Sequence, residues 1–330
     1  MRDRNPKRNT ARATRWGVVP LLAWAALVWC NGDPARAEPI NFFPTGNAER
    51  DMSRERFPDV VILIDNPRFP NRPTNDVAQA PFMTEENWLT GWNIKDLRFL
   101  YDVATDRMGV AVNFFKNPDG TAINIAGDAD GDGDPNRSDP RTLLAGGIDQ
   151  PNFGGTESIT VALDLNQDGI PDVVAGIPAE KNGDGLSAFT VARFRPATVG
   201  EIQAGIERSY GEPLSANIGE LTYVGTRDAP DFQFTIEAFS TLPGYTVQTD
   251  PDGVPFLQFG VRAYAGSLED VVAGEDLFFL RTSPQIIPEP TSLLVLTVLG
   301  SLTAAWSLTR GRRRGAFARP LLSDRMVDVN

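Results

Sequence analysis

The sequence predicts an all-β protein: a single antiparallel β-sandwich that lies between an N-terminal signal peptide and a C-terminal transmembrane sorting helix. Residues 38–287 contain about ten short apolar segments separated by stretches rich in Gly, Pro, Asp and Asn, a pattern typical of a sandwich. Only residues 200–209 have apolar side chains at helical spacing. Both ends of the 330-residue chain instead combine basic residues with one apolar run, which is typical of segments that direct export or membrane insertion.

Residues 1–37 have the three parts of a secretory signal peptide. Six basic side chains lie within residues 2–15, and an apolar run of about 15 residues follows over 16–30. Ala35 and Ala37 then supply a small-x-small motif, so we expect the Sec machinery to export the chain and cleavage to follow Ala37. A retained membrane anchor is the alternative, but the run is shorter than the ~20 residues of a typical span.

The body of the chain is predicted to be one domain of short strands over residues 59–287. Residues 38–58 contain scattered prolines and charges and are predicted to be a leader into this domain. The first strand is expected at 60–64, an apolar run bounded by prolines. Apolar and polar side chains alternate on both sides of the polar residues 102–106, which predicts an antiparallel hairpin over 92–114. The same reasoning predicts further strands at 123–126, 158–164, 173–177, 189–194, 221–224, 232–236, 256–265 and 277–280.

The C-terminal region has three features in order. The motif Pro288-Glu289-Pro290 comes first, and residues 292–308 follow as a run of 17 residues without charge. Four arginines then mark the cytoplasmic side of this predicted membrane span. They are Arg310, Arg312, Arg313 and Arg314. Residues 315–330 are expected to form a cytoplasmic tail.

This order of motif, span and arginine cluster resembles the sorting signal of the PEP-CTERM proteins of Gram-negative bacteria. The resemblance covers residues 288–314, and the tail after them is longer than this class leads us to expect. It implies recognition by an exosortase, cleavage at or near residues 288–290, and delivery to the cell surface or the extracellular matrix after transient anchoring in the inner membrane. It implies nothing about the activity of the body.

Two Asp-rich segments in the body place oxygen ligands at the spacing of a cation-binding loop. Both fit D-x-[DN]-x-D-G with a further ligand at the ninth position, and alternate side chains of such a segment converge on one ion as the chain coils. The first loop supplies Asp128, Asp130, Asp132, Asp134, Asn136 and Asp139. The second loop supplies Asp164, Asn166, Asp168 and Asp172.

Hard oxygen ligands without His or Cys favour Ca²⁺ as the cofactor. The loops differ from an EF-hand because the twelfth positions, Asp139 and Ala175, are not glutamate and because the flanks are predicted strands. They resemble the Asp-rich calcium loops of extracellular β-proteins, dockerins and thrombospondin repeats. The alternative is that Asp-Gly forms a solvated turn without an ion. In that case the crowded carboxylates of the first loop repel one another, at a cost on the order of 1 kcal/mol for each close pair.

Composition excludes several other functions. The chain has no histidine and one cysteine, Cys30, which excludes His-dependent nucleophilic catalysis, His-ligated metals and internal disulfides. Residues 38–287 hold 18 basic and 38 acidic side chains, so the body is expected to repel nucleic acid and anionic lipid. We expect no enzyme, and a glycoside hydrolase that uses two carboxylates is the least favoured alternative. The acidic residues considered for such a pair are Glu157, Asp164, Glu237, Asp270 and Glu275.

The leading hypothesis is an exported, Ca²⁺-stabilised scaffold with a structural or adhesive role at the cell surface or in an extracellular matrix. The alternative is a carbohydrate-binding module that engages extracellular polysaccharide through Trp88 and Trp92. Trp92 begins an alternating strand, however, so core packing is the favoured prediction for its side chain. In architecture alone, the body resembles calcium-loop sandwich modules of the DOMON and family-9 carbohydrate-binding types, with haem bound through His excluded.

Overall fold

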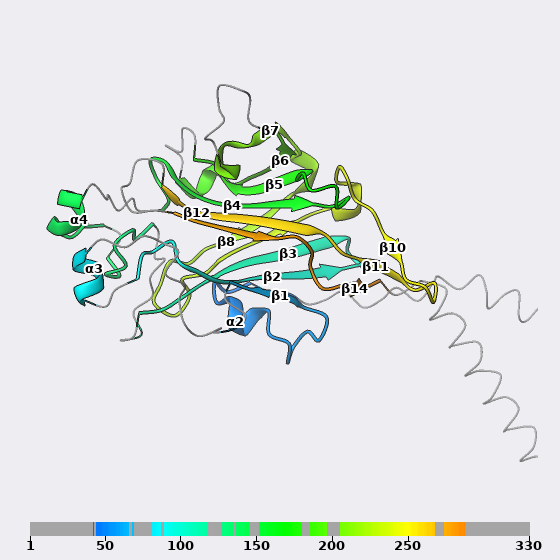
Figure 1. The fold of residues 1–330 in the computed structure, drawn as a ribbon, viewed down its shortest axis with the longest axis horizontal. Helices are drawn as coiled ribbons and strands as arrows, with labels where there is room; N and C mark the ends of the chain where they lie inside the picture. Colours follow the sequence, from blue (N-terminus) through cyan, green and yellow to red (C-terminus); the bar gives the residue numbers. More distant parts are fainter. Residues whose placement is uncertain are drawn as a thin grey trace, which may run out of the picture. The chain divides into compact units, whose positions relative to one another are not determined.

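Two large antiparallel sheets face each other in the part of the chain that the computed structural model describes (Figure 1). The described residues are 42, 44–65, 68, 81–86, 89–117, 120, 127–134, 136–145, 152–179, 185–196, 205–267 and 274–287. All of them belong to one compact unit, Ala37–Ile287. The predicted signal peptide, sorting motif, membrane span and tail lie outside the described residues, as do Trp88, Asp270 and the strand predicted at 123–126.

The first sheet has five strands in the order β1-β2-β3-β9-β8. They are β1 (Val61–Ile64), β2 (Ile94–Asp102), β3 (Arg107–Phe114), β9 (Phe232–Ile236) and β8 (Ile218–Thr222). The hairpin predicted over 92–114 is confirmed, because β2 and β3 pair antiparallel along their whole length. Strand β9 pairs with the other side of β3, and β1 with the other side of β2, so the hairpin lies at the centre of this sheet.

The second sheet has six strands in the order β13-β12-β4-β5-β6-β7. They are β13 (Glu275–Phe279), β12 (Gly260–Ser267), β4 (Glu157–Asp164), β5 (Val173–Ile177), β6 (Thr190–Phe194) and β7 (Tyr210–Pro213). Strands β5 and β9 have the predicted bounds, and β1, β4 and β6 differ from the prediction by one residue at one end. Their apolar runs are bounded by turn residues, which explains this agreement.

Residues 256–265, predicted as one strand, contribute to two strands in different sheets. Strand β11 (Pro255–Leu257) lies between β10 (Gln248–Thr249) and β14 (Gln285–Ile286) in a small three-stranded sheet, whereas β12 belongs to the second large sheet. The chain leaves the ladder between them at Gln258, whose side chain donates to the carbonyl oxygen of Thr282 at 2.7 Å. The prediction of a single strand was wrong because the apolar run continues through this break.

Helices are few and short among the described residues. They are the α-helices α2 (Ala48–Asp51), α3 (Pro81–Glu86) and α4 (Pro140–Ala145), and the 3-10 helices η1 (Gly185–Ala188), η2 (Ile206–Arg208), η3 (Ser215–Asn217) and η4 (Phe239–Thr241). The helix predicted over 200–209 is reduced to η2 in its described part, and residues 200–204 lie outside that part. In the ranges given above, no helix has the length and apolar character needed to cross a membrane.

One hydrophobic core fills the space between the two large sheets. Alternate side chains of both sheets contribute to it, among them Phe99 from β2 and Val161 from β4. The ring of Phe99 meets that of Phe259 edge to face, with 5.4 Å between their centroids. Trp92 is fully buried in this core, which confirms core packing for that residue. The described chain is therefore all-β, with antiparallel sheets in a sandwich-like arrangement.

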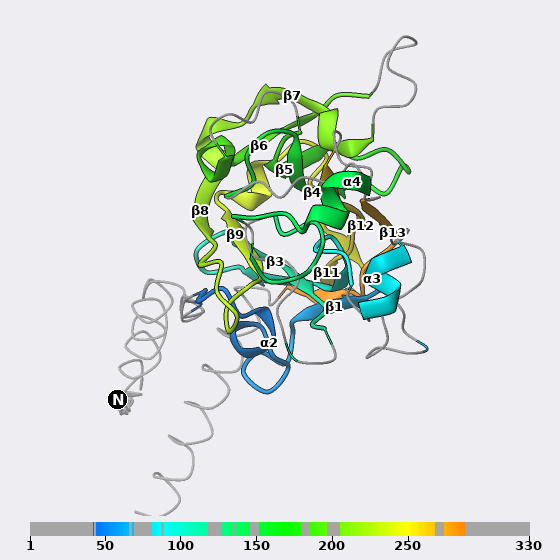
Figure 2. The ribbon, with the colours of Figure 1, turned by 90° about the vertical axis from the view of Figure 1, so that its left-hand side faces the viewer.

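Residues 44–58 of the predicted leader pack on the outer face of the first sheet. Met52 joins Leu100 in a second buried cluster there, and α2 lies on the side of β1, β2 and β3 that faces away from the second sheet (Figures 1 and 2). The guanidinium of Arg98 donates to Asp96 at 2.6 Å and to the carbonyl oxygen of Met52 at 2.9 Å. This stretch is therefore an integral part of the domain, not a segment that only leads into it.

Candidate metal-binding loops

The first Asp-rich loop brings three carboxylates together. One oxygen of each of Asp128, Asp130 and Asp132 lies within 4.8 Å of the other two. Asp128 and Asp130 are fully buried, and Asp132 is half-buried. Three hard oxygen donors at this spacing can hold a divalent metal ion.

Backbone N–H groups hold the Asp128 carboxylate in place. Its Oδ1 accepts from the N–H of Gly131 at 2.8 Å and of Asp132 at 3.2 Å, and its Oδ2 accepts from the N–H of Gly133 at 2.6 Å. Charge-assisted bonds of this kind are among the stronger hydrogen bonds in proteins. The orientation of the first ligand is therefore set by the loop backbone before any ion binds.

The second Asp-rich loop repeats two of these three hydrogen bonds. The first-position carboxylate, Asp164, accepts from the N–H of the fifth residue at 3.1 Å and of the sixth at 2.9 Å. The equivalent bonds in the first loop measure 3.2 Å and 2.6 Å. The N–H of the fifth residue also donates to the third side chain in both loops, at 2.9 Å for Asn166 and at 3.1 Å for Asp130. The backbone therefore folds in the same way around the first carboxylate of both motifs. Among the described residues, however, only the first loop brings three carboxylates close enough together to hold an ion, and the carboxylates of the second loop do not form such a group.

The backbone has the same shape in the two loops. The fourth residues, Gly131 and Gln167, have φ angles of 72° and 59°, and the sixth residues, Gly133 and Gly169, have φ angles of 88° and 90°. Left-handed backbone disfavours most side chains, which explains why both motifs have glycine at the sixth position. Two segments from different parts of the chain thus adopt one loop conformation.

Carboxylate crowding changes the acidity of both loops. Burial raises the pKa of Asp132, and the charges of Asp130 and Asp134 raise it further, although an N–H bond from Asp134 acts in the opposite direction. Burial likewise raises the pKa of Asp172, with its acidic neighbours in the second loop adding to the effect. A cation between the carboxylates opposes both shifts, because an opposite charge favours the ionised form.

The later ligand positions differ between the loops. Asp172, the ninth residue of the second loop, accepts from the N–H of the second residue at 2.8 Å and so closes that loop. The ninth residue of the first loop, Asn136, is exposed and its N–H donates to Asp134. Asp139 forms a 3.0 Å ion pair with Arg141, whose hydrogen bonds hold the pKa of this carboxyl below its usual value. The side chain of Asp139 is therefore engaged by arginine.

The two loops lie at opposite ends of β4. The second loop begins at Asp164, the last residue of this strand. The first loop contacts the residues before β2, where Gly91 donates to the carbonyl oxygen of Ala129 at 3.4 Å. The first residue of β2 in turn donates to Glu275, which the strand pairing aligns with Ile159 near the start of β4. Eight residues of strand separate the two ends by roughly 25 Å, so an ion in one loop shares no ligand with an ion in the other.

Comparison with protein families gives a match that falls on the second loop. Residues 155–189 match the family model of the FG-GAP repeat, a repeat that typically binds Ca²⁺. The match covers about a tenth of the chain and includes β4, the second loop, β5 and η1. No curated protein and no solved structure matches the chain.

Four of the carboxylates that were considered for hydrolysis lie among the described residues, and one of them, Glu157, is buried at the start of β4. Asp164 is the first ligand position of the second loop. Glu237 forms a 2.7 Å ion pair with Arg107, and Glu275 accepts from the N–H of Ile94. These three side chains therefore have structural partners within the fold.

Sequence reasoning missed a cavity next to α2. Its polar lining includes Asn47, Glu49, Lys95, Lys116 and Asp231, which come from four separate stretches of the chain. No local pattern marks such a set, because only the packing of α2 against the first sheet brings these residues together.

Proposed function

We propose that the protein is an exported surface or matrix protein whose β-sandwich is stabilised by Ca²⁺ in two Asp-rich loops. The observation that carries the proposal is the shared geometry of the loops. In each, the N–H groups of the fifth and sixth residues hold the first carboxylate, and the fourth and sixth residues have left-handed backbone. The FG-GAP match over the second loop supports calcium as the ion and an extracellular location.

Calcium stabilises this fold by compensating the charge that folding concentrates. Folding buries Asp128 and Asp130 and places Asp132 beside them, so the folded chain holds three carboxylates close together that the unfolded chain separates. The ion binds the folded state in preference and shifts the equilibrium toward it. Because the loops lie at opposite ends of β4, each ion strengthens one end of the sandwich. This design supports a role as a structural or adhesive scaffold.

Thermal unfolding tests the calcium proposal. We expect the melting temperature of the purified chain to rise by about 5–10 °C for each loop that binds an ion when free Ca²⁺ is about 100-fold above its dissociation constant, compared with a buffer that contains EGTA. Mg²⁺ at the same concentration is the control, because its strict octahedral geometry suits these loops less well. Equal melting temperatures in Ca²⁺ and EGTA would contradict the proposal.

Export and sorting form the second half of the proposal. The signal-peptide pattern of residues 1–37 supports Sec-dependent export, and the PEP-CTERM resemblance of residues 288–314 supports sorting by an exosortase. The membrane is then a transient location, through residues 292–308, and the final location is the cell surface or an extracellular polymer. Residues 38–287, without cysteine, need no disulfide in an oxidising compartment.

Protein sequencing and cell fractionation test this half. We expect the mature chain to begin at Glu38, because cleavage follows Ala37. Replacing Pro288, Glu289 and Pro290 together by alanine is expected to leave the protein in the membrane fraction. Pro284→Ala, a nearby proline outside the motif, is the matched control and is expected to be sorted normally. An intact N-terminus in the cytosol, or normal sorting of the triple variant, would refute this half of the proposal.

A further inference from the structure

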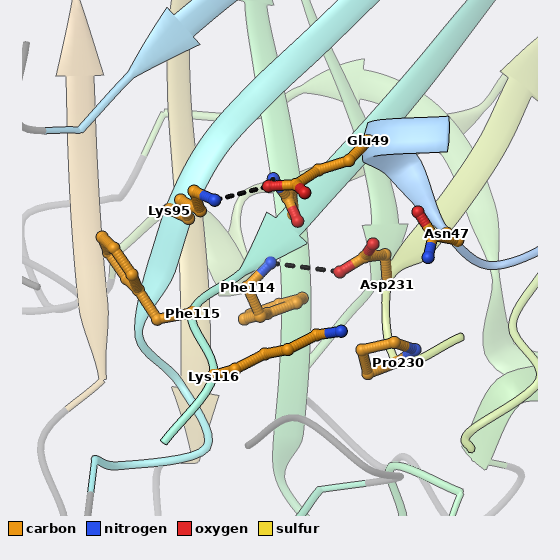
Figure 3. Close-up of a pocket in the computed structure, with 9 residues that line it drawn as sticks. Asn47, Glu49, Lys95, Phe114, Phe115, Lys116, Pro230 and Asp231 are labelled. Atoms are coloured by element: carbon orange, nitrogen blue, oxygen red, sulfur yellow. Dashed lines mark hydrogen bonds and ion pairs between the residues drawn. The ribbon is translucent and has the colours of Figure 1, made fainter. Parts of the chain in front are cut away.

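A cavity of about 230 Å³ lies on the outer side of the first sheet, beside α2 (Figure 3). It is lined by Asn47, just before α2, by Glu49 within α2, and by Lys95 on β2, which forms an ion pair with Glu49. Residues 113–116, at the end of β3, and residues 230–231, just before β9, complete it. The stretch that the sequence suggested as a leader thus builds part of a concave surface.

The base of the cavity holds two buried polar side chains in set positions. Asp231 is 4% exposed, and its carboxylate accepts from the N–H of Ala48 at 2.8 Å and from the N–H of Phe114 at 3.2 Å. Asn113 is 3% exposed and donates to Asp96 at 2.7 Å. Each carboxylate oxygen of Asp231 has a second lone pair that can accept a further hydrogen bond. The base is therefore organised before a ligand arrives.

Burial gives Asp231 an unusual acidity. It raises the pKa of this carboxyl to about 7, with the charges of Asp96 and Glu49 adding to the effect, although the two backbone N–H bonds act against it. Near neutral pH the group is therefore present in both forms. It can accept a hydrogen bond when ionised and donate one when protonated, which suits a hydroxyl partner.

The rim of the cavity alternates positive and negative side chains. Lys95 forms an ion pair with Glu49. Burial raises the pKa of Glu49, but Lys95, together with Asn113 and Arg98, holds it below its usual value. The ammonium of Lys116 is exposed on the other side of the opening, and Figure 3 shows it pointing toward Asp231 and Pro230. Two lysines thus balance two carboxylates, in a body that otherwise has about twice as many acidic as basic residues.

This lining suits an uncharged molecule with many hydroxyl groups. Vicinal hydroxyls can donate to the carboxylates of Glu49 and Asp231 and accept from the ammonium groups of Lys95 and Lys116. Phe115 and Pro230 also line the cavity, but both are buried and leave little apolar surface for a ligand, so its polar groups carry the recognition. A balanced set of charges gives no net attraction to an anion or a cation, so hydrogen bonding decides what binds.

We propose that this cavity binds one neutral hexose unit of an extracellular polysaccharide. Its volume is below the ~300–1,000 Å³ of pockets that enclose drug-sized ligands, so it holds one sugar ring while the rest of the polymer stays outside. The inference does not depend on calcium, because neither Asp-rich loop lines the cavity. Its failure would leave the calcium proposal intact, and the reverse also holds.

The test measures polysaccharide binding by the full chain in a detergent without sugar groups. The probes are dextran, mannan and galactan as neutral polymers, polygalacturonate as an acidic one and chitosan as a basic one. We expect at least one neutral polymer to bind and the two charged polymers to bind more weakly. Binding of only a charged polymer, or of none, would overturn the proposal.

Two exposed rim residues supply the variants. Glu49→Ala and Lys116→Ala are each expected to weaken binding of the neutral polymer by about tenfold, because each removes a charged hydrogen-bond partner. Glu212→Ala is the matched control, since its side chain is 80% exposed on β7 of the other sheet, and it is expected to bind like the unaltered chain. If both rim variants bind as well as Glu212→Ala, the sugar binds elsewhere and the assignment of this cavity is wrong.

Discussion

Replacing Asp128 with alanine is expected to lower the free energy of unfolding by about 3–6 kcal/mol in the presence of Ca²⁺. The fully buried carboxylate accepts from three backbone N–H groups, those of Gly131, Asp132 and Gly133, at 2.8, 3.2 and 2.6 Å. Its removal deprives these groups of their acceptor, at about 1–3 kcal/mol for each one that is buried, and removes one ligand of the proposed Ca²⁺ site. Urea-induced unfolding, followed by tryptophan fluorescence, measures the change.

The same measurement in EGTA separates the metal from the hydrogen bonds. Without an ion, the unaltered loop carries uncompensated charge, so losing Asp128 also relieves repulsion and the net cost is expected to be smaller. Asp252→Ala is the matched control, because this carboxylate is exposed in a turn outside both Asp-rich loops. We expect it to cost less than about 1 kcal/mol. A cost for Asp128→Ala that is equal in Ca²⁺ and EGTA would contradict a metal at this site, and a cost no larger than that of Asp252→Ala would contradict the loop geometry.

The Asp-rich loops could be predicted from sequence because all of their contacts are local. The first carboxylate and the N–H groups that hold it are at most five residues apart, so the motif alone determines the turn. Strands such as β5 and β9 were predictable for a related reason, since an apolar run bounded by turn residues marks a buried strand wherever it occurs. The partner of the twelfth residue, Asp139, was less predictable. Its side chain pairs with Arg141, whose position is set by α4.

Features that depend on distant residues were not predictable in this way. Strand β7 has the sequence Tyr-Gly-Glu-Pro at a sheet edge, with no buried side, so no alternation marks it. Strands β10 and β14 have two residues each and exist only because β11 pairs with both. The cavity beside α2 is lined by both Glu49 and Asp231, which lie far apart in the sequence. No pattern in a single sequence relates residues at that separation.

Replacing Gly176 with alanine is expected to cost at least about 3 kcal/mol of folding free energy. Gly176 lies on β5 with a φ of 137°, where L side chains are strained. A Cβ there would lie 3.0 Å from the carbonyl carbon of Ile159 on β4, and closer still to its oxygen. Backbone atoms cannot rotate away as a flexible side chain can, so β4 and β5 would have to separate. Urea-induced unfolding again measures the loss.

Gly253→Ala distinguishes the clash from the dihedral strain. Gly253 also has a positive φ, 85°, but a Cβ there would meet nothing within 4 Å, so alanine is expected to cost only about 1–2 kcal/mol. Equal costs for the two variants would show that the close approach of β4 and β5 contributes nothing. A larger cost for Gly176→Ala, together with a weaker effect of Ca²⁺ on its melting temperature, would have a structural meaning. It would show that the register of the β4–β5 hairpin is what holds Asp164 and Asp172 in position to bind the ion.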